Sequence, residues 1–333
     1  AALQWGAGAG ASRLISGTMG PHRALESRLA AFKGYEAALL FGSGYLANTG
    51  AIAALAGRGE VVFSDELNHA SIVDGCRLSR ADTFVYRHGD VEHLRWGLRQ
   101  AGERASLIVT DGVFSMDGDV APLPELLELA RQHGARLMVD EAHATGAVGP
   151  GGRGSVSAAG LSGEVDVVVG TLGKALGSYG AYVCAGSELV DFLVNSARPF
   201  IFSTAPPPAA AGAALAALEV LEAEPELVER LQQNAETLRS ALAVRGLEVG
   251  SSTTQVVPLH VGDAEMTMDL CERALLRGVF AQGIRPPTVP EGSSRLRFTV
   301  MATHRRQELL DAAAKVAAAA HAVGLADSQP LAA

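Results

Sequence analysis

The chain has 333 residues, of which 48% are hydrophobic and 19% charged, values that are ordinary for a globular α/β protein. Its net charge is −9 and no stretch is strongly basic, which argues against nucleic acid or an anionic membrane as its main partner. The three cysteines, Cys76, Cys184 and Cys271, fit no disulfide or zinc spacing, and no apolar run is long enough to cross a membrane or to act as a signal peptide. We expect a cytoplasmic protein with reduced thiols, no metal site and room for two domains.

Helical and strand patterns alternate through the first two thirds of the chain. Apolar residues at helical spacing predict helices over 21–33 and 122–133, and a third helix that ends near residue 57. Short apolar runs predict strands at 37–41, 60–65, 83–88, 107–112, 137–140 and 167–169. This alternation favours a mainly parallel sheet with helical crossovers.

The pattern changes after the three prolines at 206–208. Alanine-rich and charged helices are predicted at 209–222 and 224–245, strands at 254–261 and 295–301, a helix between these strands, and a last helix over 305–322. We predict a large domain over residues 1–224 and a smaller α+β domain over 225–333, whose tail from residue 327 is disordered. Because the chain starts Ala-Ala-Leu without Met, we also expect an N-terminal segment of the full protein to be missing.

Two charged residues follow neighbouring predicted strands. Asp140 ends the strand in RLMVDEAH, with His143 three residues on, and Lys174 follows the strand in VVVGTLGKALG. Open α/β sheets bind ligands at the carboxyl ends of their strands, so both side chains are expected at the same crevice. Taken singly, Asp140 is equally well a helix cap or surface acid, and Lys174 a solvated lysine. Together they are typical of an enzyme that uses pyridoxal phosphate (PLP), whose aldehyde a lysine holds as a Schiff base and whose ring nitrogen a carboxylate keeps protonated.

Two nucleotide-binding alternatives fail on the residues. DEAH at 140–143 matches a helicase motif, but Val168 and Ala175 stand where a phosphate-binding GxxxxGK[ST] loop needs Gly and Ser or Thr. The glycine run at 6–10 has no strand before it, which argues against a dinucleotide loop and leaves a flexible loop as its interpretation.

Three further features have both a structural and a functional interpretation. Gly44 and Tyr45 lie in GSGY at a strand-to-helix turn, which is either a plain turn or a phosphate site built from helix N–H groups. His69 is either solvated or an aromatic ring stacked on the cofactor. Arg297 alternates with apolar residues on a strand, as an edge charge or as a clamp for an α-carboxylate.

Motifs along almost the whole chain resemble the α-oxoamine synthases, PLP-dependent enzymes of fold type I with a large, mainly parallel α/β domain and a small α+β domain. The resemblance rests on GASRLISGT, LLFGSGYLAN, NHAS, DGVFSMDGD, VDEAHATG, TLGKALGSYGAY, FSTAPPP and IRPPTVP. The lysine loop reads LGK where many members have FGK or SGK. Members also carry an Asn-Tyr-Leu-Gly stretch near the N-terminus that helps to close the site, and this chain lacks it.

The resemblance implies a role for each matching residue. Lys174, His69, Asp140 and His143 would be catalytic: Lys174 carries the cofactor, Asp140 pairs with its ring nitrogen, His143 bonds its phenolic oxygen and His69 stacks on the ring. The remaining cofactor contacts would come from Gly44, Tyr45, Ser115, Thr171, Ser203 and Thr204, the last two reaching the neighbouring subunit of a homodimer with shared sites. Substrate would be bound by Arg13, Ser115, Arg285, Thr288 and Arg297.

The resemblance also implies the reaction, a decarboxylative condensation of an amino acid with an acyl thioester. The IRPPTVP segment favours L-alanine with pimeloyl-CoA or a pimeloyl-acyl carrier protein. The sister reaction, glycine with acetyl-CoA or succinyl-CoA, is the alternative. A PLP lyase or cysteine desulfurase is less favoured because no cysteine lies in a glycine-rich loop near the site, and Lys174 argues against a non-catalytic partner subunit.

Overall fold

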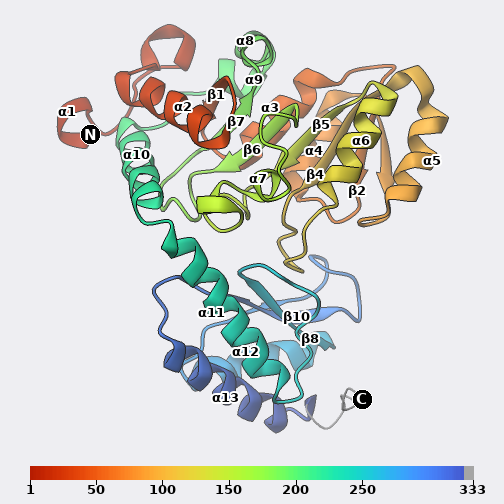
Figure 1. Cartoon of the computed structure of the whole chain (residues 1–333), viewed down its shortest axis with the longest axis vertical. Helices are drawn as coiled ribbons and strands as arrows, with labels where there is room; N and C mark the ends of the chain where they lie inside the picture. Colours follow the sequence, from red (N-terminus) through yellow and green to blue (C-terminus); the bar gives the residue numbers. More distant parts are fainter. Residues whose placement is uncertain (326–333) are drawn as a thin grey trace. The chain divides into compact units, whose positions relative to one another are not determined.

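The computed structural model describes residues 1–325, which form two compact units (Figure 1). The first contains Ala1–Phe114 and Val120–Pro225, and the second contains Ser115–Asp119 and the chain from Glu226 on. The chain passes from the first unit to the second between Pro225 and Glu226, and the domain boundary at 224/225 stays a prediction. The short segment Ser115–Asp119 of the DGVFSMDGD motif was assigned by the sequence to the large domain, but it belongs to the second unit.

The first unit is built on a seven-stranded sheet with the order β1-β7-β6-β5-β4-β2-β3. The five strands from β6 to β3 are parallel, whereas β7 runs antiparallel to both of its neighbours, β1 and β6. The predicted mainly parallel sheet is therefore confirmed. The strands are β1 (Ala37–Phe41), β2 (Val61–Asp65), β3 (Asp82–Tyr86), β4 (Ala105–Asp111), β5 (Arg136–Asp140), β6 (Val167–Thr171) and β7 (Ala181–Ala185).

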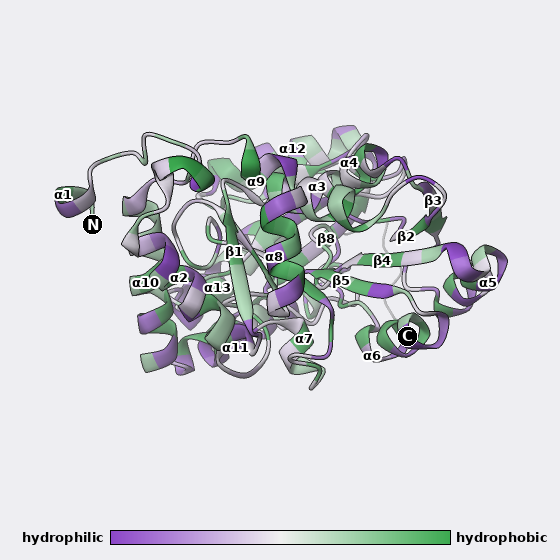
Figure 2. Cartoon of the chain, turned by 90° about the horizontal axis from the view of Figure 1, so that it is seen from above, coloured by the Kyte–Doolittle hydropathy of each residue, from purple (hydrophilic) through white to green (hydrophobic). Residues whose placement is uncertain are grey.

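Helices cover both faces of this sheet. Against one face, α3 and α4 pack with α8 and α9 around a core of alanine, valine, leucine and phenylalanine side chains, and α2, α5 and α6 contact strands as well. In Figure 2 the strands β1 and β4 are drawn mainly in the hydrophobic colour, as expected for strands that are covered on both sides. The helical segments are α1 (Ala2–Trp5), a π-helical turn (Arg13–Gly17), α2 (Gly20–Lys33), α3 (Gly44–Leu55), α4 (Ala70–Ser79), α5 (Val91–Ala101), α6 (Leu123–His133), α7 (Ser155–Ala158), α8 (Ser187–Ser196), α9 (Arg198–Ile201) and α10 (Pro208–Ala223), with 3-10 turns at Gly102–Arg104 and Pro150–Gly152.

The second unit is a three-stranded antiparallel sheet with the order β8-β10-β9, packed against helices. Its core is formed by the apolar residues of β8 and β10 together with one face each of α11, α12 and α13. The elements are α11 (Glu226–Ala243), β8 (Val256–Gly262), α12 (Ala264–Leu276), β9 (Gln282–Ile284), β10 (Ser294–Thr299) and α13 (Arg306–Ala322). The predicted tail, from residue 327, lies outside the described residues.

Two strands were not predicted from the sequence. The segment AYVCA, which follows a glycine-rich loop, forms β7 between the edge strand β1 and β6 of the large sheet. The strand β9 has only three residues and pairs with β10 at the edge of the small sheet. Both depend on pairing with strands distant in the sequence, which local patterns do not show.

Candidate active site

The carboxyl-terminal edge of the large sheet carries three buried acids. Asp65, Asp111 and Asp140 are the last residues of the parallel strands β2, β4 and β5, and they are only 3%, 5% and 4% exposed. Asp111 and Asp140 lie directly opposite each other in the register of β4 and β5. Thr171 ends β6 at the same edge. This is the position at which open α/β sheets bind ligands.

Lys174 and His143 meet at this edge. The Lys174 amine lies 2.8 Å from His143 Nε2. Lys174 belongs to the loop between β6 and β7, which is held by hydrogen bonds such as that from the Ser178 amide to the Leu172 carbonyl, at 2.8 Å. The amine is exposed, although its loop is fixed. The structure therefore brings Lys174 next to the turn that follows Asp140, and its role toward a cofactor stays a prediction.

The carboxylate of Asp140 is held by hydrogen bonds to both oxygens. Its Oδ1 accepts from the Ala142 amide at 2.8 Å, which shapes the turn that carries His143. Its Oδ2 accepts from Asn48 Nδ2 at 2.6 Å, and the same nitrogen donates to Ser71 Oγ at 2.9 Å. Ser71 in turn contacts His69, with 2.7 Å between Ser71 Oγ and His69 Nδ1. Asp140, His69 and His143 thus belong to one connected site.

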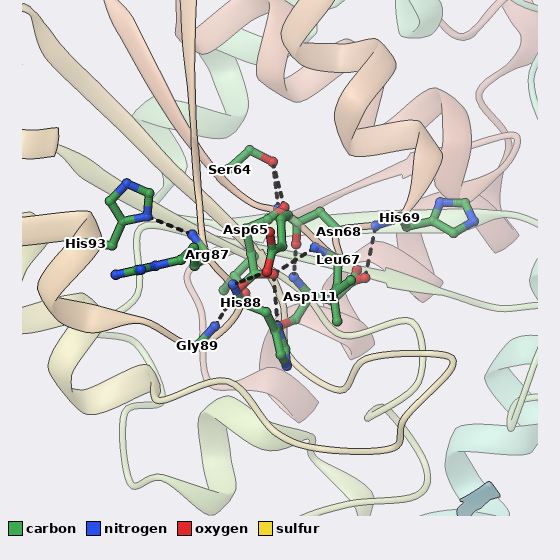
Figure 3. Close-up of polar contacts among 12 residues, drawn as sticks. Ser64, Asp65, Leu67, Asn68, His69, Arg87, His88, Gly89, His93 and Asp111 are labelled. Atoms are coloured by element: carbon green, nitrogen blue, oxygen red, sulfur yellow. Dashed lines mark hydrogen bonds and ion pairs between the residues drawn. The ribbon is translucent and has the colours of Figure 1, made fainter. Parts of the chain in front are cut away.

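His69 begins helix α4 and is anchored through its backbone by Asp111 (Figure 3). The His69 amide donates to Asp111 Oδ2 at 3.1 Å, and the Asp111 amide donates to Asn68 Oδ1 at 2.8 Å. Asn68 is fixed by donating to Ser64 Oγ at 2.9 Å and to the Val109 carbonyl at 2.8 Å. Burial, and next the negative charge of Asp140, raise the pKa of Asp111 well above its usual range.

Asp65 organises the neighbouring loops in the same view (Figure 3). Its Oδ1 accepts from the Leu67 amide at 2.9 Å and lies 3.0 Å from His88 Nδ1, while its Oδ2 accepts from the Gly89 amide at 3.0 Å. Each of these three strand-end acids therefore accepts hydrogen bonds from backbone amides of the loops. These bonds offset the cost of burying the carboxyl groups.

The start of α3 offers donors for an anion. Ser43 caps this helix by accepting from the Leu46 amide at 3.2 Å, which leaves the preceding amides, those of Gly44 and Tyr45, at the positive end of the helix. No atom lies within 4 Å of the place where a Cβ on Gly44 would stand, so a ligand can approach the backbone closely. Thr171 Oγ1 accepts from the Gly173 amide at 3.2 Å, which places its hydroxyl in the lysine loop.

These features fit PLP. The cofactor needs an amine for its aldehyde, a buried carboxylate for its ring nitrogen and backbone N–H groups for its phosphate. Lys174, Asp140 and the Gly44–Tyr45 amides supply these three groups, and all of them belong to the first unit.

Three predicted residues of the first unit lie away from this cluster of contacts. Arg13 is buried and pairs with Glu26 at 2.8 Å, and its Nε donates to Thr18 at 2.9 Å. Ser203 and Thr204 follow α9, and Thr204 forms a β-bridge with Ser12. Their predicted contacts with substrate and with a partner subunit stay predictions.

The other predicted substrate residues belong to the second unit. Arg297 on β10 donates through Nε to the Ser115 carbonyl and through a terminal nitrogen to Thr299 Oγ1 at 3.1 Å, and burial lowers the pKa of its guanidinium. Arg285 and Thr288 are exposed in the turn that contains Pro286-Pro287, closed by a 3.1 Å bond from the Thr288 amide to the Arg285 carbonyl. Their roles toward substrate stay predictions.

Sequence reasoning missed Asn48, Ser71, Asn68, Asp65 and Asp111. The signal for the two acids was present, because each closes an apolar strand run as Asp140 does. No sequence pattern pointed to Asn48 or Ser71. Asn48 lies inside a predicted helix, and no element was predicted around Ser71. Both residues reach the site only because α3 packs on α4.

Residues 1–325 contain no group of three or more His, Cys, Asp or Glu side chains arranged to hold a metal ion. Within the same residues, no helix has the length and apolar character needed to cross a bilayer.

Residues 1–316 match the family described as aminotransferase class I and II. The chain is 54% identical over 314 residues to the 8-amino-7-oxononanoate synthase of Citrifermentans bemidjiense, covering 93% of this chain and 81% of that protein. It is 55% identical over 326 residues to the enzyme of the same name from Geobacter sulfurreducens, covering 97% and 83%.

Solved structures agree with this fold. Serine palmitoyltransferase of Sphingomonas wittichii superposes with a TM-score of 0.94 at 33% identity, covering 97% of this chain and 82% of that chain. An 8-amino-7-oxononanoate synthase from Francisella tularensis superposes with a TM-score of 0.82 at 28% identity, covering 95% and 90%.

The chain belongs to the class I and II aminotransferase family and is a PLP-dependent transferase of fold type I. This confirms the fold, the cofactor and the enzyme class that the sequence predicted. Within that family, its relatives at more than half identity place it with the 8-amino-7-oxononanoate synthases, acyltransferases of the α-oxoamine synthase type.

Proposed function

We propose that the chain condenses L-alanine with a pimeloyl thioester, with loss of CO2 and of the thiol, to give 8-amino-7-oxononanoate for biotin biosynthesis in the cytoplasm. The observation that carries this proposal is the meeting of Lys174, His143 and the buried Asp140 at one sheet edge, in a chain more than half identical to synthases of that name. The acyl carrier is either CoA or an acyl carrier protein.

PLP, when bound, supplies an electron sink for the charge that develops on the amino-acid Cα. Asp140 would face its ring nitrogen, because the carboxylate is buried and both of its oxygens are oriented by hydrogen bonds. Gly44, Tyr45 and Thr171 would bind its phosphate, and His69 would cover one face of its ring.

Lys174 would hold the cofactor through its amine and, once released by substrate, take the Cα proton of alanine. The Lys174 amine lies 2.8 Å from His143 Nε2. This contact would hold the amine at the site after substrate has released it from the cofactor. After condensation and decarboxylation, the protonated amine would return a proton to the same carbon. Arg297 would bind the alanine carboxylate, for which a guanidinium is well suited.

Purified enzyme tests the substrates directly. Alanine, glycine and serine would each be combined with pimeloyl, acetyl, succinyl and palmitoyl thioesters, and thiol release, CO2 release and product mass measured. The proposal requires the highest kcat/KM for alanine with pimeloyl thioester. Preference for glycine or for serine would assign the chain to a sister reaction. Pimeloyl-CoA and a pimeloyl-acyl carrier protein, compared side by side, distinguish the carriers.

A homodimer with shared sites is part of the proposal, with Ser203 and Thr204 reaching the phosphate of the partner's cofactor. Mixing Lys174→Ala subunits with subunits that carry both Ser203→Ala and Thr204→Ala tests this sharing. If both variants are inactive alone, their heterodimers contain one intact site, and about a quarter of the parental activity returns. No recovery after subunit exchange would show that each chain builds its own site.

Arg285 is proposed to bind the far carboxylate of the pimeloyl chain. It is exposed beside the stiff Pro286-Pro287 turn, and proline fixes φ there. Arg285→Met should remove the preference for pimeloyl over heptanoyl thioester while turnover of the heptanoyl substrate is kept. Equal losses on both substrates would favour a structural role, or a role in binding the α-carboxylate.

A further inference from the structure

Asn48 connects three elements of the site. It lies on α3, is 1% exposed, and donates from one nitrogen to Asp140 at the end of β5 and to Ser71 on α4, at 2.6 and 2.9 Å. We propose that Asn48 is a positioning residue that couples the ring-nitrogen partner Asp140 to the ring-stacking His69 through Ser71. The proposal rests on PLP binding at this site and not on the choice of acyl donor.

The chemistry of the acceptors fixes the orientation of the Asn48 amide. An ionised carboxylate only accepts hydrogen bonds, so the NH2 group of Asn48, and not its oxygen, must face Asp140. The Asn48 oxygen is then buried without a partner among residues 1–325. Such an unsatisfied acceptor costs about 1–3 kcal/mol, and an apolar residue would avoid the cost. A buried group retained at this cost requires an explanation, which the link to Asp140 provides.

From Asn48 to His69, each group donates a hydrogen bond to the next one. Ser71 Oγ accepts from Asn48, so its own O–H is free to donate to His69 Nδ1 at 2.7 Å. The Ser71 backbone amide also donates to His69 Nδ1, at 3.2 Å. Two donors on Nδ1 make this nitrogen the acceptor, so the neutral ring carries its proton on Nε2. The Ser71 amide alone makes Nδ1 an acceptor, and Asn48, by occupying the acceptor side of the Ser71 hydroxyl, directs that O–H to the same nitrogen and so helps to orient the ring.

The backbone of His69 is held independently. Its amide donates to Asp111 Oδ2 at 3.1 Å, so the start of α4 stays in place without Asn48. Loss of Asn48 should therefore release the Asp140 carboxylate and the His69 ring while the helix remains. Misplacement of a site group by about 1 Å is enough to reduce a rate about a hundredfold.

The test uses Asn48→Ala, Ser71→Ala and the double variant as holoenzymes. Asn48→Ala is expected to weaken PLP binding, to shift the pH at which the visible absorption of bound PLP changes, and to lower kcat about a hundredfold with a smaller change in the KM for alanine. Because the two residues act in series, the double variant should lie within about twofold of Asn48→Ala in kcat. Losses that multiply, or a PLP affinity and spectrum equal to those of the parent, would overturn the proposal.

Asn234→Ala is the matched control for lost stability. Asn234 is a buried asparagine of α11 that also donates two hydrogen bonds, to the Met301 and His304 carbonyls at 2.9 Å. Its loss should lower the unfolding temperature and leave the spectrum of bound PLP unchanged. If that spectrum shifts as much in Asn234→Ala as in Asn48→Ala, the effect is general destabilisation and the proposal fails.

A measurement on the parent protein avoids dependence on folding of Asn48→Ala. Nitrogen-15 NMR of the His69 ring, assigned with His69→Gln, should show an unprotonated Nδ1 and a protonated Nε2 when the ring is neutral. A proton on Nδ1 would contradict the direction of donation and remove the link. Neither result depends on turnover, so failure of this proposal is separable from failure of the proposed reaction.

Discussion

The two edges of the large sheet carry acids in opposite surroundings. At the amino-terminal edge, Glu60, Asp82 and Asp166 are exposed, and they satisfy nearby groups such as the Leu137 amide, 2.8 Å from Asp166 Oδ2. At the carboxyl-terminal edge, the strand-end acids are buried. A buried carboxylate carries a desolvation cost that an exposed one avoids, and acids kept buried at this cost mark the second edge as the candidate functional site. We therefore expect substitution of an acid at the carboxyl-terminal edge to reduce turnover or stability more than substitution of an acid at the amino-terminal edge.

The largest contrast is expected between Asp140→Asn and Asp166→Asn. The first should still bind PLP but lose at least about a hundredfold in kcat, because a neutral amide cannot hold the ring nitrogen protonated. The second should stay within about twofold, since an exposed amide can still accept from Leu137. Steady-state kinetics on both variants measure this, and comparable turnover in the two would remove Asp140 from the mechanism.

Ion pairs should show the same contrast in stability. Lys33 and Glu141 form a buried pair beside Asp140, whereas Arg131 and Glu164 form an exposed pair at 2.9 Å. Lys33→Met leaves the buried Glu141 carboxylate without its cation and should lower the free energy of unfolding by about 3–5 kcal/mol. Arg131→Met should cost less than about 1 kcal/mol. Urea unfolding followed by circular dichroism compares them, and equal costs would contradict the difference between the two edges.

A smaller, pH-dependent effect is expected at Asp111. Because burial raises its folded pKa, this group binds a proton more tightly in the folded than in the unfolded state. Its stabilising contribution is then complete below its ordinary pKa of about 3.9 and is lost as pH rises toward the raised folded value. Asp111→Asn should remove this loss, at most about 1.4 kcal/mol per pH unit. The measurement is the difference in unfolding free energy between parent and variant across pH, and a constant difference would show that Asp111 is not protonated in the fold.

Much of the candidate site could be predicted because its charged residues lie at or just after the ends of apolar strands. The apolar runs before Asp140 and Lys174 indicated both strands and the shared edge. Asn48 could not be predicted, because its partner Asp140 lies far along the chain and only the packing of α3 brings them together. The strand β7 was hidden for a similar reason, since its antiparallel place between β1 and β6 depends on pairing and not on its own pattern.

The most direct test of the account is to identify the residue that carries the cofactor. The holoenzyme would be reduced with borohydride and digested, and the peptide that retains the pyridoxyl group sequenced by mass spectrometry. We predict modification of Lys174 alone, and no modified peptide, no yellow absorption and no turnover in Lys174→Ala. A pyridoxyl group on another lysine, or substantial turnover by Lys174→Ala, would contradict the central claim.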